Sequence, residues 1–189
     1  MDGCVDHTIH LLVEYRAIIG HSNMEPAHSA QKGKRPDESK SETAIIMAPS
    51  DANPRGNVFG GVIMKHVDLI AGLVAKRHSG HANLVTASID RMTFLKPVYI
   101  GNALILSARV NYVRRSSLEI EVTVESEDLY EGERALTGTA FVTLVALDEH
   151  SKPIGVPPLI LDTEEEKKRF LEGESRMLTR LREAGRISQ

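Results

Sequence analysis

A glycine-rich turn followed by a single carboxylate is the feature of this 189-residue chain best suited to chemistry. The turn spans residues 53–61 (NPRGNVFGG), and Asp68 follows it. Where such a turn opens a helix, the first backbone N–H groups are free and the helix dipole favours negative charge. An acid in the following turns can act on whatever those donors hold. The pattern is therefore compatible with a hydrolytic site, and the alternative is a turn whose glycines only provide unusual backbone angles.

The residues after the turn predict the helix that would carry this acid. Apolar side chains recur at helical spacing, which places one stripe against a core or a sheet; they are Ile63, Val67, Ile70, Ala71 and Val74. Asp68 lies on the flank of the stripe. Acids are rarely buried unless they are paired or used, so a partly buried Asp68 would be functional. An exposed carboxylate at the edge of the stripe is the equal alternative.

Composition limits the partners and the compartment. The net charge of -3, the pI near 6.2 and the 4% aromatic content give no general attraction to nucleic acid. Cys4 is the only cysteine, which favours a reducing compartment. No apolar run is long enough to span a membrane, and charges within the first twenty residues argue against a signal peptide. We expect a soluble cytoplasmic protein with no nucleic-acid or membrane partner.

The chain divides into three regions. Residues 1–43 are expected to form a flexible N-terminal arm, because residues 21–43 are rich in Ser, Lys, Glu and Pro. Residues 44–160 form the predicted domain. Residues 161–189 contain a final helix that begins with Thr163 and Glu166 at capping-box spacing, and its dense charges predict a solvated helix packing on a neighbour.

Four alternating runs in the domain predict antiparallel strands. The first, at 84–95, changes phase near Asp90-Arg91 and therefore predicts a bulge. The runs at 104–112 and 118–124 are joined by a hairpin-length connection, with Glu119 and its alternate neighbours facing outward. The last run, at 136–146, is apolar on both faces, which is typical of a central strand or a subunit contact. A helix covering one face of such a sheet is an α+β arrangement.

This order of motifs resembles the acyl-CoA thioesterases of the hotdog fold. The similarity covers roughly residues 43–160 and leaves out the arm and the final helix; its segments are 49–61, 63–64, Asp68, 94–98, Gly101, 114–117, 141–146 and Pro157. The resemblance implies a long central helix wrapped by a curved antiparallel β-sheet. It also implies a homodimer with composite active sites, assembled as a homohexamer that is a trimer of dimers.

The resemblance further assigns roles to individual residues. Asp68 matches the catalytic acid, and Asn53 matches an asparagine that meets this acid across two subunits. The amides of Gly60 and Gly61 match the donors to the thioester carbonyl. The implied reaction converts acyl-CoA to free CoA and a carboxylic acid with no cofactor. Asp68 would act either as general base on a water or as a nucleophile that forms a mixed anhydride.

Binding of coenzyme A would need cations and donors near the site entrance. Arg114, Arg115, Ser116 and Ser117 match the family segment that approaches the nucleotide, and Lys96, Arg91 and Arg55 are further candidates. A pair of solvated arginines is the alternative interpretation of this segment. The acyl chain would pass along the helix beside Val62, Met64 and Val67, unless these residues are ordinary core.

Three other functions fit parts of the pattern. A non-catalytic acyl-CoA sensor would need a DNA-reading element, which residues 1–43 do not offer. A hotdog dehydratase would use a catalytic histidine, whereas Lys65-His66 precedes the helix acid here. A purely structural oligomer would leave Asp68 in solvent. We expect no metal site, because His66, His78 and His81 lack metal-ligand spacing.

Overall fold

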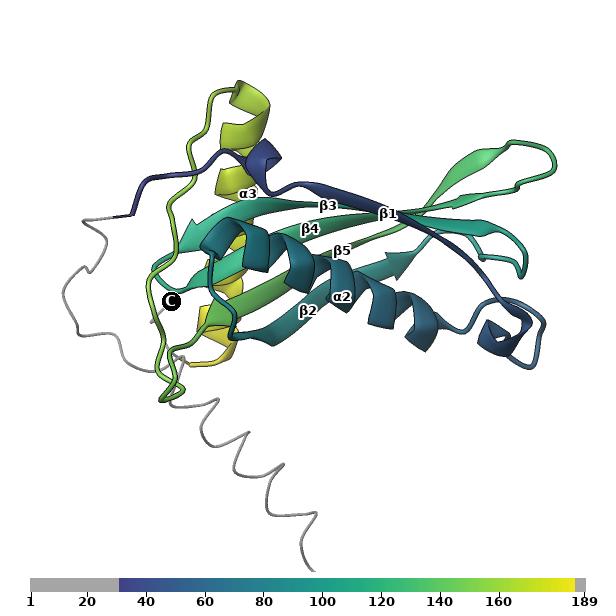
Figure 1. Ribbon diagram of the computed structural model, residues 1–189, viewed down its shortest axis with the longest axis horizontal. Helices are drawn as coiled ribbons and strands as arrows, with labels where there is room; N and C mark the ends of the chain where they lie inside the picture. The colour runs from purple at the N-terminus through teal and green to yellow at the C-terminus, as the bar shows by residue number, and fades with distance from the viewer. Residues whose placement is uncertain (1–30, 186–189) are drawn as a thin grey trace, which may run out of the picture.

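The computed structural model describes residues 31–185, in which a curved antiparallel sheet wraps one long helix (Figure 1). The elements are η1 (Pro36–Glu38), β1 (Ser41–Ile46), η2 (Pro49–Asp51), α2 (Gly60–Ser79), β2 (Leu84–Phe94), β3 (Ala103–Arg114), β4 (Ser117–Glu127), β5 (Arg134–Ala146) and α3 (Glu164–Glu183). The five strands follow the order β1-β3-β4-β5-β2, so β1 and β2 are the edges of an open sheet. The predicted α+β arrangement is confirmed.

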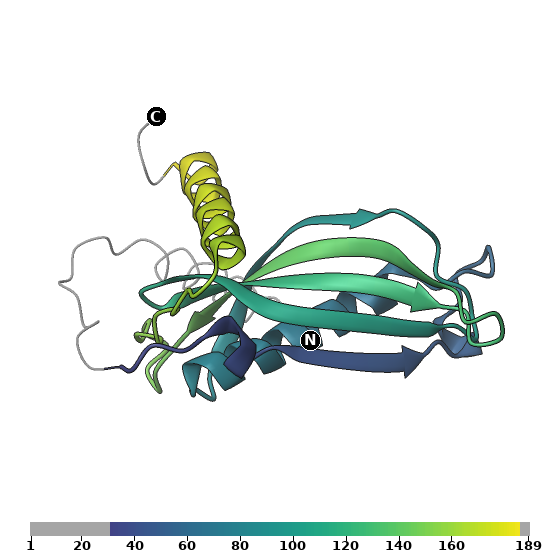
Figure 2. The same cartoon turned by 90° about the horizontal axis from the view of Figure 1, so that it is seen from above.

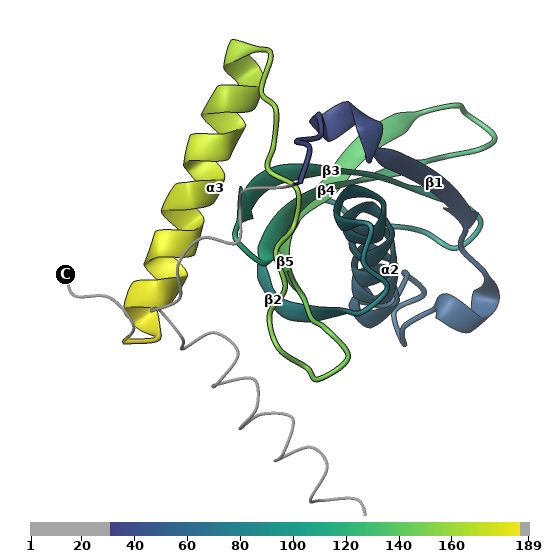
Figure 3. The ribbon, with the colours of Figure 1, turned by 60° about the vertical axis from the view of Figure 1, so that its left-hand side comes forward.

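Helix α2 lies inside the curve of the sheet, and its predicted apolar stripe forms the centre of the core (Figure 3). All five stripe residues are 3% exposed or less. They pack against the inward-facing side chains of the sheet, chiefly Leu104, Leu106, Leu118, Ile120, Val122, Val142 and Leu144. The helix ends at Gly80, whose φ of 73° is the left-handed conformation that glycine adopts readily.

Strand β2 contains two irregularities, and the second lies where the sequence predicted a bulge. The pairing register with β5 shifts between Thr86 and Ser88 and again between Asp90 and Thr93. Before the first shift, Thr86 pairs with Leu144, whose side chain belongs to the core. Thr86 therefore lies on the inner face of the sheet, toward α2.

The folded domain begins earlier than the predicted boundary at Ala44. Strand β1 starts at Ser41 and pairs with β3 from that residue, while η1 precedes it. A short polar strand of this kind is hard to see in sequence because its partner lies some sixty residues away in the chain. Residues 1–30 of the predicted arm lie outside the described residues. Between residues 31 and 185, no helix has the length and apolar character needed to cross a membrane.

Helix α3 packs on the outer face of the chain's own sheet, near one end (Figure 2). The predicted capping box is confirmed: the Glu166 amide donates to Thr163 Oγ1 at 3.2 Å, and Thr163 N donates to the Glu166 carboxylate at 3.0 Å. Gly173 allows close approach, because a Cβ there would lie 2.6 Å from Cβ of Tyr112. The expectation of a solvated helix therefore holds only for its outward side.

A buried ion pair holds α3 on the sheet. Glu119 faces outward from β4 as predicted, but α3 covers it and leaves it 1% exposed. Arg176 donates to its carboxylate through Nη2 at 2.7 Å and Nε at 3.1 Å, and Arg180 adds a contact at 3.4 Å. The Arg176 guanidinium also lies 3.7 Å from the ring centre of Phe141. The charge on Glu119 is thus compensated by the helix that buries it.

His78 forms a second connection, at the C-terminal end of α2. Its ring is fully buried, with Nδ1 3.2 Å from Ser39 Oγ and Nε2 3.1 Å from the Pro157 carbonyl oxygen. These contacts join α2 to the segment before β1 and to the segment after β5. Burial lowers the pKa of His78, because the charged imidazolium loses its hydration; the Pro157 carbonyl opposes this shift.

We predict that Arg176→Met destabilises the fold by about 3 kcal/mol, because it leaves the Glu119 carboxylate buried with only the longer contact to Arg180. Urea unfolding at fixed protein concentration measures the change. Arg182→Met is the matched control, since its exposed side chain has no partner among residues 31–185, and it should change stability by no more than about 0.5 kcal/mol. Equal effects of the two substitutions would contradict the assignment.

We also predict that stability falls as the pH drops below 6.5, the ordinary pKa of a histidine side chain. The folded-state pKa of His78 is depressed, so the unfolded chain takes up a proton first and unfolding becomes easier, by at most about 1.4 kcal/mol per pH unit. Unfolding of native protein and His78→Gln between pH 7 and 5.5 tests this. The dependence should flatten in His78→Gln and persist in His150→Gln, where the histidine is exposed; an unchanged slope in His78→Gln would argue against it.

Candidate active site

Asp68 lies midway along α2 and is held by a residue of β2. Thr86 Oγ1 donates a hydrogen bond of 2.7 Å to Asp68 Oδ1. Asp68 is half-buried, so it is not the fully solvated carboxylate of the alternative interpretation. The sequence analysis did not select Thr86. The bulge expected from the sequence lies at Asp90-Arg91, away from Thr86, and the face that Thr86 occupies follows only from the strand register.

The N-terminus of α2 presents free donors. Among residues 31–185, the amides of Gly60 and Gly61 have no hydrogen-bond acceptor, and no acidic residue occupies the first turn of the helix. A Cβ on Gly61 would lie 2.5 Å from Cε1 of Phe59, whereas one on Gly60 would come no closer than 3.5 Å to Phe94. Two unfilled N–H groups at a helix start can accept an anion or a polarised carbonyl oxygen.

Asn53 shapes the turn in front of the helix. Its Oδ1 accepts from the amides of Arg55 at 2.8 Å and Asn57 at 3.3 Å, and Gly56 provides a φ of 84° within the same turn. The side-chain NH₂ of Asn53 donates to no group in the described part of the chain. No contact joins Asn53 to Asp68 within this chain. Asn53 therefore offers its donors away from its own turn.

The predicted nucleotide-binding residues do not form one cluster in a single chain. Arg114, Arg115, Ser116 and Ser117 form the β3–β4 turn, and Ser117 pairs with Val145 beside the start of β2. Lys96 follows Phe94, at the opposite end of β2. Arg91 lies between the two ends, and its side chain is outside the described residues. The sheet therefore separates two groups that the sequence analysis considered together.

At the β3–β4 turn, the two arginines have different surroundings. Arg115 has a φ of 45°, a conformation uncommon for a residue with a side chain, and its guanidinium has no partner within residues 31–185. Arg114 Nη1 lies 3.2 Å from Met177 Sδ, and Ser117 Oγ donates to the Arg114 carbonyl at 3.1 Å. Arg115 is thus the freer of the two cations.

The residues considered for an acyl channel divide between core and surface. Val67 is fully buried and belongs to the core, Val62 packs partly against it, and Met64 is exposed. Met64 belongs to a set of exposed apolar side chains on α2 that includes Leu69, 59% exposed, and Leu73. Leu69 and Leu73 lie one turn apart on the helix surface, and neighbouring exposed apolar side chains favour a covered surface over a solvated one. The helix that carries Asp68 therefore also carries a candidate subunit contact.

Within residues 31–185, no group of three or more His, Cys, Asp or Glu side chains is arranged to hold a metal ion. Two of the three histidines singled out in the sequence bond to backbone carbonyls: His78 contacts Pro157, and His81 Nε2 lies 2.9 Å from the Gly155 oxygen. Their role is to join α2 to neighbouring segments.

Comparison with known proteins places these features in a family. A model of the thioesterase superfamily matches residues 55–133. The cytosolic acyl coenzyme A thioester hydrolase of Rattus norvegicus is 40% identical over 142 residues, which is 74% of this chain and 37% of the relative. The chain thus spans less than half the length of that relative.

Two solved structures resemble the chain over most of their length. A hexameric acyl-CoA thioesterase superposes with a TM-score of 0.77 at 37% identity, covering 82% of this chain and 98% of the other. The acyl-CoA hydrolase of Staphylococcus aureus, in complex with butyryl coenzyme A and coenzyme A, gives 0.73 at 33% identity, covering 80% and 92%. That enzyme has also been solved with an aspartate, a threonine and an asparagine replaced singly by alanine.

Proposed function

The chain belongs to the thioesterase superfamily and has the hotdog fold, and from this premise we propose that it hydrolyses the thioester of acyl-CoA to free CoA and a carboxylic acid. The observation that carries the proposal is the position of Asp68, whose carboxylate is held by Thr86 on a helix that begins with two free amides. The names of the rat and bacterial relatives support this substrate class. The rat relative's name also supports a cytoplasmic location.

In this proposal Asp68 acts through Oδ2, the carboxylate oxygen that does not bond to Thr86. Thr86 fixes Oδ1, so Oδ2 can hold a water and remove its proton as the water oxygen bonds to the carbonyl carbon. The carbonyl oxygen becomes an oxyanion and accepts hydrogen bonds from the backbone N–H groups of Gly61 and Gly60. Breaking the C–S bond then releases a thiolate, which needs little acid assistance. Direct attack by Oδ2 would give a mixed anhydride with the same residues.

The site is proposed to be composite, with two subunits contributing to each reaction centre. Gly61 and Asp68 lie seven residues apart on one helix, a rise of about 10 Å. A reacting carbonyl must lie about 3 Å from both its nucleophile and its donors, so the amides of the same helix are poorly placed for a carbonyl at Asp68. A second subunit can bring its own turn to Asp68, including the unpartnered NH₂ of Asn53.

Three observations support a homodimer that assembles further into a hexamer. Apolar side chains are exposed along α2, at Met64, Leu69 and Leu73, and β2 is an open edge of the sheet. A related structure is hexameric. Pairing through this region would cover the apolar side chains beside Asp68.

Coenzyme A is proposed to place its phosphates at the β3–β4 turn. Arg115 supplies a guanidinium that has no partner within residues 31–185, and Arg114, Ser116 and Ser117 supply further donors. Lys96 and Arg91, toward the other end of β2, would contribute from the second subunit if the two chains run in opposite directions across the interface. The proposed reaction needs no cofactor, because CoA enters and leaves as part of substrate and product.

Asp68→Asn should reduce thiol release from acyl-CoA by about 100-fold or more, since it removes the base while keeping the size of the side chain. The measurement is release of free CoA from acyl-CoAs of increasing chain length, at matched oligomeric state. Asp37→Asn, an exposed carboxylate in η1, is the control and should retain native rates. If Asp68→Asn retained native activity, Asp68 would not be the catalytic acid. Binding without turnover by native protein would favour a non-catalytic acyl-CoA sensor.

Subunit complementation tests the composite site. Asn53→Ala and Asp68→Ala homo-oligomers should each be inactive. When the two chains are refolded together, mixed dimers should contain one intact site, which restores about a quarter of native activity for random pairing. Refolding each variant alone is the control. If the mixture stays as inactive as its components, the composite site is wrong: either Asn53 and Asp68 act within one subunit, or they do not belong to the same site.

A further inference from the structure

A small cavity lies on the outer face of the sheet, on the side opposite Asp68. It has a volume of about 150 Å³ and forms where the segment before β1, strands β3 and β4, and the first turns of α3 meet. Its lining consists of Lys40, Ser107, Ala108, Arg109, Glu121, Thr123 and Arg169. We propose that this cavity binds a small phosphate-class anion, either inorganic phosphate or a phosphomonoester group.

The floor of the cavity is built by paired residues of two strands. Ser107 pairs with Thr123, and Arg109 pairs with Glu121. Because alternate residues of a strand share a face, all four side chains project outward from the sheet. Lys40, immediately before β1, and Arg169 on α3 complete the walls. Three cations and one carboxylate therefore surround the space.

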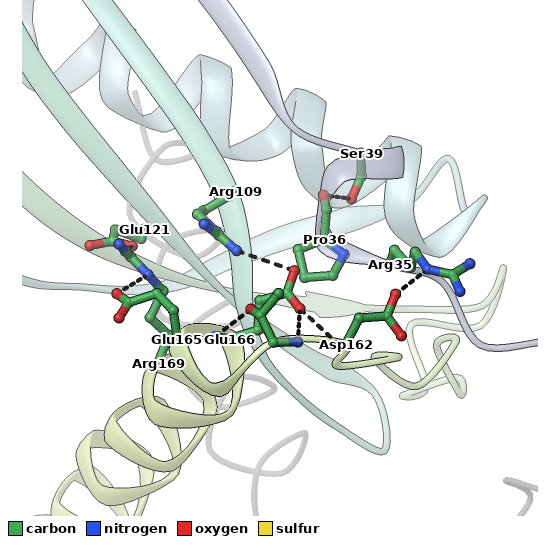
Figure 4. A network of polar contacts seen from close by, with 10 residues as sticks. Arg35, Pro36, Ser39, Arg109, Glu121, Asp162, Glu165, Glu166 and Arg169 are labelled. Carbon is green, nitrogen blue, oxygen red and sulfur yellow. Dashed lines mark hydrogen bonds and ion pairs between the residues drawn. The ribbon is translucent and has the colours of Figure 1, made fainter.

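The single carboxylate is already neutralised. Arg169 binds Glu121 through Nη1 and also contacts Glu165 at 3.1 Å. In Figure 4 Arg169 bridges these two acids, while Arg109 reaches toward Glu166 instead. Glu121 is therefore turned to Arg169, which compensates its charge, and the cations left for an anion are Lys40 and Arg109.

Two cations keep unused donors. Arg109 is only loosely paired, with Nη2 3.8 Å from Glu166, and its side chain remains 22% exposed. Lys40 Nζ has no partner among residues 31–185. A guanidinium paired at that distance makes no full hydrogen bond to the carboxylate, so an anion in the cavity can accept from it.

The hydroxyl groups also favour a ligand rich in acceptors. Ser107 Oγ gives its proton to Glu42 at 2.6 Å, whereas Thr123 Oγ1 has no partner in the described part of the chain and can donate. Lys40, Arg109 and Thr123 thus offer donors around a space that is too small for a nucleotide but large enough for a tetrahedral anion. Such an anion would connect β3 to the segment before β1, next to α3.

Phosphorus NMR titration of the full-length native protein tests the proposal, with inorganic phosphate and methyl phosphate as probes and sodium chloride at equal ionic strength as the blank. We expect saturable binding, weakened about tenfold or more by Lys40→Met and by Arg109→Met. Lys168→Met, an exposed lysine on α3 with no partner within residues 31–185, is the matched control and should bind normally. Comparing the two probes separates free phosphate from a monoester.

Lys40→Met carries the test if Arg109→Met fails to fold, because Lys40 is exposed and its side chain makes no hydrogen bond or ion pair within residues 31–185. Absence of saturable binding in native protein would overturn the proposal, as would unchanged binding in Lys40→Met. Loss of binding in Arg115→Met, with Lys40→Met normal, would place the anion at the β3–β4 turn and also overturn it. Thiol release is measured separately, so this result stands apart from the proposed enzymatic activity.

Discussion

Burial of one face of α2 against the inner surface of the curved sheet is the constraint on which the rest of the structure depends. Val67, Ala71 and Val74 are fully buried, so the helix cannot rotate without exposing them. Because the rotation of the helix is fixed, the direction of the side chains on its flank is fixed as well. Asp68 then faces β2, where Thr86 can reach it. The packing of small apolar side chains thus determines where the carboxylate points.

The outer face of the same sheet is organised by charge. Three acids on this face form ion pairs with arginines of α3. The pairs are Glu119 with Arg176, Glu121 with Arg169, and Asp90 with Arg180. Apolar contact alone would let a helix slide along a flat surface, whereas paired charges on defined strands allow one position. Asp90 lies at the second register shift of β2 and is paired with Arg180 of α3. Helix α3 therefore also restrains the strand that carries Thr86. The two faces of the sheet are therefore linked through β2.

The sequence predicted those features that depend on local periodicity and missed those that depend on distant partners. The stripe of α2, the strand runs, the bulge in β2 and the capping box at Thr163 all follow from residues a few positions apart. The role of Thr86 depends on a hydrogen bond to a residue of another element. The burial of Glu119 depends on a helix some fifty residues later, and alternation alone could only place it on the outer face. The start of β1 at Ser41 likewise required its pairing with β3.

One chain holds all the proposed catalytic groups yet does not bring them together. The acid and the amides share a rigid helix, so no local rearrangement can close the distance between them. Asn53 is fixed by its own turn through Oδ1, which leaves only its NH₂ to act elsewhere. Under the proposed composite site, a chain with these constraints would gain activity by pairing, and the apolar side chains exposed on α2 would give pairing a driving force. If association completes the site in this way, activity and stability should both depend on protein concentration through the same equilibrium.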